Sequence, residues 1–219
     1  TSLDLNVSRE MVQDSPVIKK ISKVLIKRIL SELNKKLNKD PDGYDKFWAQ
    51  FGKVLKEGLY EDVANRDKIA GIIRVFSLKY DKLITLKDYS TELALGQDQI
   101  FYLTSETLSQ ARKSPHLEGF TAKGVDVLLM TDPIDAFWMS QMGKFEDKSF
   151  TSISRDKYDL SGVGKVDDKE PEVPEKASNE LLELIKNALN DKVEDVKISS
   201  NLKESPVRLV AGQAGLDYN

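Results

Sequence analysis

The chain has 219 residues, of which 40% are hydrophobic, enough for one large or two small domains with apolar cores. Its 36 acidic and 33 basic residues give a formal net charge of −3, so no global excess draws it to nucleic acid or anionic lipid. The absence of cysteine excludes disulfides and thiolate chemistry. No apolar run approaches the roughly 20 residues of a membrane span, and no signal-peptide pattern opens the chain. We therefore expect a cytoplasmic protein without membrane or nucleic-acid partners.

Two polar residues near the start of the chain are predicted to project from the same face of a helix. Arg9 and Gln13 lie four residues apart at the mouth of a predicted helix, so both project from one helical face. A guanidinium and an amide placed in this way are able to reach a single external anion. The alternative is that Arg9 is an ordinary solvated arginine of a first helical turn, because such surface arginines are common.

Residues 1–98 are predicted to form a small helical bundle. The apolar residues of the first helix recur at three- and four-residue steps and make one stripe: Val17, Ile18, Ile21, Val24, Leu25, Ile29, Leu33 and Leu37. Asp40-Pro41-Asp42-Gly43 ends this helix. Eight basic residues and one acidic residue lie between Val17 and Lys39, which indicates either a solvated helix face or a contact for an acidic partner or phosphates.

Two further helices complete the predicted bundle. The second helix contains an aromatic group, Phe47, Trp48 and Phe51, which we expect to anchor the core between helices. Gly58 stands where a helix C-cap is expected. The apolar spacing between Ile69 and Phe76 predicts the third helix.

Residues 99–160 show a change of period that predicts an α/β unit. Strands are expected at 100–103, 125–130 and 150–154, with helices at 106–113 and 134–142 between them. This β-α-β-α-β order is typical of a small doubly wound parallel sheet with right-handed crossovers. The chain contains neither a G-x-G-x-x-G motif nor a P-loop, so we expect no nucleotide site in this unit.

Three polar residues of this unit could suggest chemistry. Asp132 and Asp135 could act as an acid/base pair, but an N-cap before Pro133 and a first-turn carboxylate explain them better. His116 is the only histidine. Without a second histidine or a cysteine we expect no metal site, and we interpret His116 as a polar loop residue.

Four large apolar residues lie close together on one short predicted helix: Phe137, Trp138, Met139 and Met142. Consecutive helical residues point to different faces, so Phe137, Trp138 and Met139 cannot all face inward. Methionines adapt to varied apolar surfaces, which suits contact with other proteins. Packing between helices or domains is the alternative role.

The remainder of the chain is predicted to leave the α/β unit. Residues 161–177 are rich in charged residues and proline and are typical of a solvated linker. In residues 178–219 we expect the beginning of a truncated α+β domain, with a helix at 179–190 capped by Ser178 and paired strands at 193–199 and 206–210.

Several runs carry a family resemblance: Leu5 to Met11, Tyr44 to Gly52, Leu86 to Tyr89, Gln99 to Thr104, and Asp132 to Asp135. Their order from about residue 3 to 155 resembles the later middle domain of the heat-shock-protein-90 family of ATP-driven chaperones, bacterial type. The residues after 178 resemble the start of that family's C-terminal domain.

The resemblance implies a function for both candidate sites. Arg9, supported by Gln13, would reach the γ-phosphate of ATP, held with Mg by a separate N-terminal domain, as an arginine finger supplied in cis. The helix with Phe137, Trp138, Met139 and Met142 would contact unfolded clients. The whole protein would be an ATPase and a homodimer, joined by helices beyond Asn219, while this chain would bind no cofactor itself. The alternative function is a non-catalytic interaction module unrelated to ATP.

Overall fold

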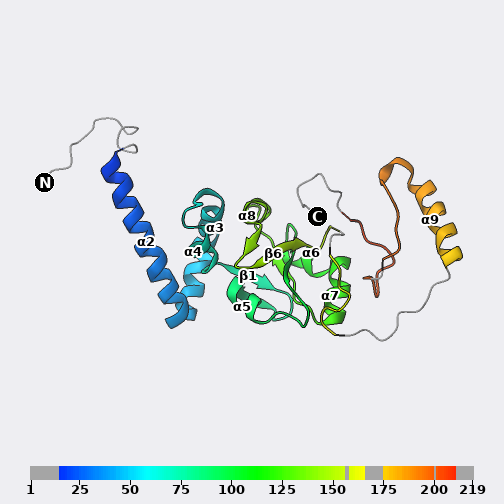
Figure 1. Ribbon diagram of the computed structural model, residues 1–219, viewed down its shortest axis with the longest axis horizontal. Helices are drawn as coiled ribbons and strands as arrows, with labels where there is room; N and C mark the ends of the chain where they lie inside the picture. The colour runs from blue at the N-terminus through cyan, green and yellow to red at the C-terminus, as the bar shows by residue number, and fades with distance from the viewer. Residues whose placement is uncertain (1–14, 156–157, 166–174, 200, 211–219) are drawn as a thin grey trace.

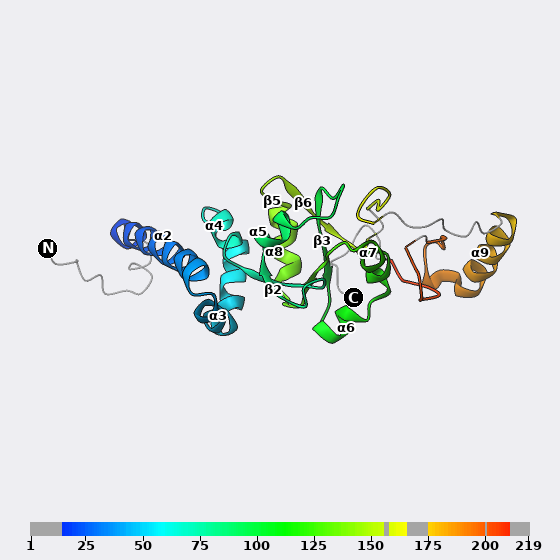
Figure 2. The ribbon, with the colours of Figure 1, turned by 90° about the horizontal axis from the view of Figure 1, so that it is seen from below.

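The structure, a computed structural model, describes residues 15–155, 158–165, 175–199 and 201–210. Figures 1 and 2 show a central body of sheet and helices, with the long helix α2 (Pro16–Lys39) at one end and α9 (Glu175–Leu189) at the other. Arg9 and Gln13 lie outside the described residues.

The boundary between the first two helices is confirmed. Helix α2 ends at Lys39, and α3 (Pro41–Glu61) begins one residue later with a proline in its first turn. The side chain of Asp40 accepts a hydrogen bond from the Gly43 amide at 3.0 Å, which caps α3. Asp40 therefore ends one helix and starts the next.

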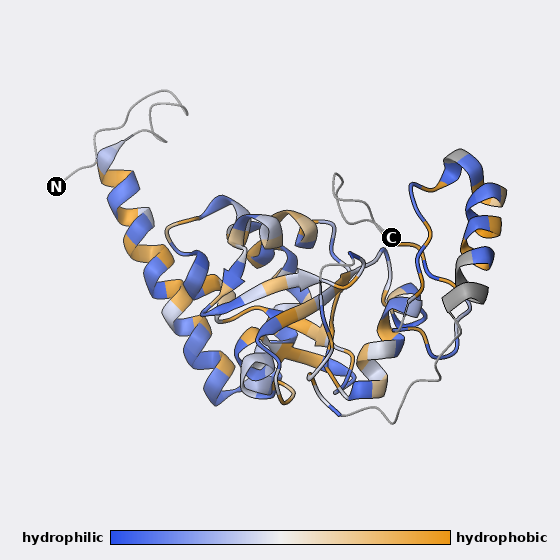
Figure 3. Ribbon diagram, turned by 45° about the vertical axis from the view of Figure 1, so that its right-hand side comes forward, coloured by the Kyte–Doolittle hydropathy of each residue, from blue (hydrophilic) through white to orange (hydrophobic). Residues whose placement is uncertain are grey.

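The predicted apolar stripe of α2 is only partly used for packing. Leu30 is buried and Leu33 and Leu37 pack against the core. In contrast, several members of the stripe are exposed: Val17, Ile21, Val24, Leu25 and Ile29. Figure 3 shows the corresponding alternation of apolar and polar residues along the part of α2 that extends away from the body.

Two expectations for α3 are wrong. Phe51 is exposed, although Trp48, from the same aromatic group, is buried. Gly58 lies inside α3 instead of capping it. A Cβ on Gly58 would stand 3.0 Å from the Cδ1 atom of Ile69, so the missing side chain permits close packing on α4 (Arg66–Ala70).

The predicted third helix is also wrong beyond Ala70. Residues 74–77 form strand β1 (Arg74–Ser77), which pairs antiparallel with β2 (Lys82–Thr85). β1 shows an alternation of half-buried and buried residues, and β-branched residues such as Val75 favour strands. The range 1–98 therefore contains a β-hairpin as well as helices. It closes with α5 (Leu86–Thr91), which begins with a capping box between Thr85 and Asp88.

The protein has a mixed six-stranded sheet with the order β2-β1-β4-β3-β6-β5. The strands β3 (Gln99–Thr104), β4 (Leu128–Met130) and β6 (Lys148–Ser152) are parallel, as predicted. β1 and β5 (Lys144–Phe145) join this trio antiparallel. The prediction of a parallel sheet thus holds for its centre and fails at both edges, where β1, β2 and β5 were not foreseen.

Helices cover both faces of the sheet and create two cores. Helices α3 and α8 (Asp135–Met142) pack on one side, and α6 (Leu108–Arg112) and α7 (Glu118–Lys123) on the other. Successive β4 residues alternate between them, with Leu128 in the first core and Leu129 in the second. His116, in the short 3-10 helix η1 (Pro115–Leu117), is buried, which corrects its interpretation as a loop residue.

The end of the chain departs from the prediction in three ways. Helix α9 begins at Glu175, so Ser178 lies within it, and the short η2 (Asn190–Lys192) follows. The described residues between 193 and 210 form no strand. At the start of the predicted linker, Val163 is buried and the amide of Lys165 donates to the Lys123 carbonyl at 2.9 Å, so residues 161–165 pack against the body.

Candidate functional site

Helix α8 is short, and local sequence features account for where it begins and where it ends. Asp135 occupies its first turn, where a negative charge suits the helix dipole, as predicted. Asp132 precedes it, and its carbonyl accepts the amide of Asp135 at 2.9 Å, although Ile134 and not Asp132 holds the N-cap position. Gly143 ends the helix with a positive φ of 66°. These local features place α8 between β4 and β5, against α3.

The four apolar residues predicted to contact clients face different ways. Trp138 is 0% exposed and Met139 is 2% exposed, so neither side chain lies on the surface of the folded body. Met142 is partly buried and packs against the same core. Phe137 is 39% exposed and is the most exposed of the four. Residues 138, 139 and 142 share the inner face because they follow the three- and four-residue spacing of a helix.

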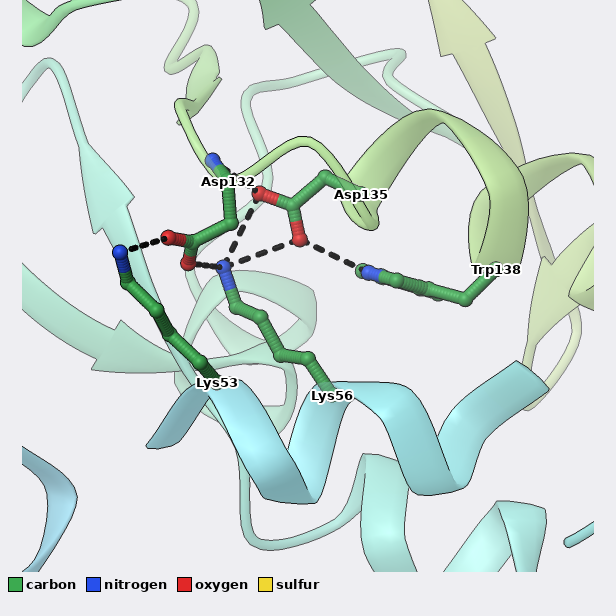
Figure 4. A network of polar contacts seen from close by, with 5 residues as sticks. All are labelled: Lys53, Lys56, Asp132, Asp135 and Trp138. Carbon is green, nitrogen blue, oxygen red and sulfur yellow. Dashed lines mark hydrogen bonds and ion pairs between the residues drawn. The ribbon is translucent and has the colours of Figure 1, made fainter. Parts of the chain in front are cut away.

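A buried polar network holds α8 against α3 (Figure 4). The Lys56 ammonium donates to Oδ2 of Asp132 at 2.8 Å, and lies 2.9 and 3.0 Å from the two carboxylate oxygens of Asp135. The indole Nε1 of Trp138 donates to Asp135 at 2.8 Å. Lys53 lies at the rim, 3.6 Å from the other oxygen of Asp132. One carboxylate thereby joins the lysine of α3 to the tryptophan of α8.

The charges of this network stabilise one another. Burial acts to lower the pKa of Lys56, but the carboxylates of Asp135 and Asp132 outweigh it and raise that pKa above its ordinary value. Burial acts to raise the pKa of Asp132, and the ammonium groups of Lys56 and Lys53 outweigh it and lower that pKa. The lysine is thus held protonated and Asp132 ionised at neutral pH, which is the charge pattern of a structural ion pair.

The outer side of α8 carries an aromatic pair. Phe137 meets Tyr60, from the last turn of α3, edge to face with ring centroids 6.4 Å apart. Tyr60 is 46% exposed. Arg66 links the two helices, because its guanidinium donates to the carbonyls of Tyr60 and Gln141, both at 3.4 Å. We call the two exposed rings the Tyr60–Phe137 face.

Sequence reasoning missed two contributors to this site. Tyr60 was not singled out, because its ring reaches Phe137 only through tertiary packing. Lys56 did leave a signal: it stands at helical spacing from the buried residues Tyr44, Trp48 and Leu59 of α3. A lysine on the buried face of an amphipathic helix needs an acidic partner, and the pair Asp132 and Asp135, which the sequence explained only by helix capping, supplies it.

Among the described residues, no group of three or more histidine, cysteine, aspartate or glutamate side chains is arranged to hold a metal ion. No helix within the described part of the chain is long and apolar enough to cross a membrane. What the site presents is a rigidly supported aromatic surface.

Comparison with known proteins extends over the whole sequence. A family model described as Hsp90 protein matches residues 1–219. The chaperone protein HtpG of Paramagnetospirillum magneticum is 49% identical over 99% of this chain and 36% of its own length. The chaperone protein HtpG of Roseobacter denitrificans is 44% identical over 99% of this chain and 35% of its own length. The chain therefore spans about a third of the length of these relatives.

Proposed function

The chain belongs to the Hsp90 protein family, and we propose that it is the segment of a longer bacterial-type chaperone that contacts client proteins and couples that contact to ATP. Its relatives are named as chaperones and are almost three times as long as the matched region. The chaperone activity, the homodimer and the cytoplasmic location belong to this proposal for the whole protein.

The observation that carries client contact is the Tyr60–Phe137 face. Two aromatic rings stand 46% and 39% exposed, side by side, on the surface of a folded body. Aromatic rings offer a large apolar area at a small cost in conformational entropy, which suits binding to chains of varied sequence. An unfolded client exposes apolar side chains that gain free energy when such rings cover them.

The buried network supplies the rigidity that this face requires. Phe137 lies between Asp135 and Trp138 in sequence, and these two residues are fully buried and hydrogen-bonded to each other. Lys56 fixes Asp135 to α3, the helix that also carries Tyr60. Because the two rings sit on helices joined by this network, they are presented in one fixed arrangement, which lowers the ordering cost of binding.

Coupling to ATP is proposed from the family resemblance of the first residues. Arg9 and Gln13 would approach the γ-phosphate of ATP bound with Mg in an N-terminal domain of the same protein. A planar guanidinium neutralises charge that develops on the transferred phosphoryl group. Helix α2 begins at Pro16, seven residues after Arg9 in the sequence, and leads through Asp40 into α3, the helix that carries Tyr60.

Aggregation suppression tests the client-contact proposal. The full-length chaperone would be compared with its Tyr60→Ser/Phe137→Ser variant for its ability to reduce light scattering by a heat-denatured reporter protein. Phe51→Ser is the matched control, because Phe51 is an exposed aromatic residue of α3 outside the face. We expect the double variant to lose most of the suppression and the control to keep it. Equal suppression by all three proteins would contradict client contact at this face.

A further inference from the structure

The carboxylate of Glu118, the first residue of α7, receives an unusual set of donors from the far end of the chain. The amides of Lys203, Glu204 and Ser205 donate to it at 2.7, 2.9 and 3.1 Å. The Ser205 hydroxyl also donates to the same carboxylate. Glu118 thus binds a consecutive run of backbone N–H groups more than 80 residues away along the sequence.

Successive amides that donate to one carboxylate bind it strongly, because each hydrogen bond is assisted by the negative charge. Hydrogen bonds to an ionised acceptor are shorter and about twice as strong as neutral ones. The Ser205 hydroxyl and the amides of Glu204 and Lys203 lower the pKa of Glu118 to about 2. The acceptor therefore keeps its charge at every physiological pH.

Neighbouring contacts show that the whole segment lies on the body. A Cβ on Gly119 would stand 2.9 Å from the Asn201 carbonyl oxygen, so the segment touches the backbone of α7 itself. Further along, Arg208 donates to the Tyr158 hydroxyl at 2.7 Å. The Tyr158 ring packs against Phe120 of α7 with centroids 4.9 Å apart. These contacts of residues 201–208 therefore lie on α7 and its neighbours.

We propose that Glu118 is a positioning residue that docks residues 201–205 on α7. The dock fixes the chain again after the region that contains α9, so the segment beyond residue 200 moves with the sheet body. This inference is independent of client contact, because the contacts that carry it lie on Glu118, Gly119 and Tyr158 and not on α8 or the Tyr60–Phe137 face. It provides a second joint, besides the covalent connection, through which movements of the body reach the residues that follow.

Hydrogen exchange of the complete 219-residue chain tests the dock directly. The amides of residues 203–205 should exchange roughly tenfold faster or more in Glu118→Ala than in the wild type, because they lose their acceptor. Amides of β3 serve as the internal reference for global opening. Glu106→Ala is the matched control, since Glu106 is an exposed glutamate of the same body and has no hydrogen bond or ion pair among the described residues.

A second variant separates docking from folding. Gly119→Ala keeps the carboxylate and favours helix in α7, but its methyl group collides with Asn201. Faster exchange of residues 203–205 in both variants, with β3 unchanged, is the expected result. If Glu118→Ala also accelerates amide exchange in β3, that variant has lost global stability. The test then rests on Gly119→Ala alone, with faster exchange of residues 203–205 and unchanged exchange in β3 as the expected result. Unchanged exchange of residues 203–205 in the deciding variant would overturn the proposal.

Discussion

The indole Nε1 of Trp138 donates a hydrogen bond to the buried carboxylate of Asp135 at 2.8 Å, one turn earlier on α8. The bond lies within α8, and Lys56 of α3, 3.0 Å from the same carboxylate, fixes this side of the helix against the core and leaves Phe137 on the outside. Trp138 therefore lies in the core of the folded body, and its neighbour Phe137 is the exposed one.

Replacement of these two neighbours should lower stability by very different amounts. Trp138→Ala removes a fully buried ring and should lower the free energy of unfolding by about 3–5 kcal/mol. Phe137→Ala removes a partly exposed ring and should cost about 1 kcal/mol or less. Urea denaturation of both variants measures the difference. Equal losses of stability would show that the assigned orientation of α8 is wrong.

The two lysines of α3 should also differ in their contribution to stability. Lys56→Ala leaves Asp135 buried without its cation, which should cost about 3–5 kcal/mol. Lys53→Ala removes an 81% exposed side chain at the rim and should cost less than about 1 kcal/mol. The same denaturation experiment gives both values, and Lys53 is the internal control. A Lys56 variant as stable as the Lys53 variant would argue against the buried network.

Two aspartates should give opposite slopes to the pH dependence of stability. The folded-state pKa of Asp132 is lowered, because its lysines outweigh burial, so its contribution is present above the unfolded value near 4 and is lost as the pH falls through the folded pKa. Burial raises the pKa of Asp126 despite its hydrogen bonds from Ser77 and the Lys79 amide. Its contribution is therefore present below the unfolded pKa and is lost as the pH rises through the folded value.

Asparagine variants isolate these slopes. Denaturation between pH 3 and pH 7 should show a weaker acid loss of stability in Asp132→Asn than in the wild type. Asp126→Asn should show a stronger acid loss than the wild type, because the gain from protonating Asp126 is gone. Slopes that change in the same direction for both variants would contradict the assigned environments.

Arg9→Ala tests the proposed coupling to ATP in the full-length protein. A transition-state arginine is worth roughly 10³-fold or more in rate, so turnover should collapse while ATP binding persists. Arg28→Ala is the control, because Arg28 is an exposed arginine of α2 whose ion pair within the described part of the chain is with its own helix, at Glu32. Unchanged turnover in the Arg9 variant would favour the non-catalytic interaction module.

Local signals in the sequence predicted part of this architecture. Asp40-Pro41 marked the junction of α2 and α3 because capping and proline effects act within a few residues. Short apolar runs separated by predicted helices indicated the parallel strands β3, β4 and β6. β1 was missed because four residues carry too little alternation to be told from a helix.

The site could be predicted less well, for a physical reason. α8 is apolar on nearly every side, so its hydrophobic pattern does not show which residue faces outward. Its orientation is decided by Lys56, which lies 79 residues before Asp135 and meets it only in the folded chain. The exposure of Phe137 and its pairing with Tyr60 follow from that tertiary contact.

Photo-crosslinking is the most direct measurement of client contact at the Tyr60–Phe137 face. Benzoylphenylalanine would replace Phe137 in the full-length chaperone, or Phe51 as the exposed control, before irradiation with an unfolded reporter protein. We expect position 137 to yield a covalent adduct with the unfolded reporter and none with the same reporter when folded, while position 51 yields little with either. Adducts from position 51 but not from position 137 would contradict client binding at this face.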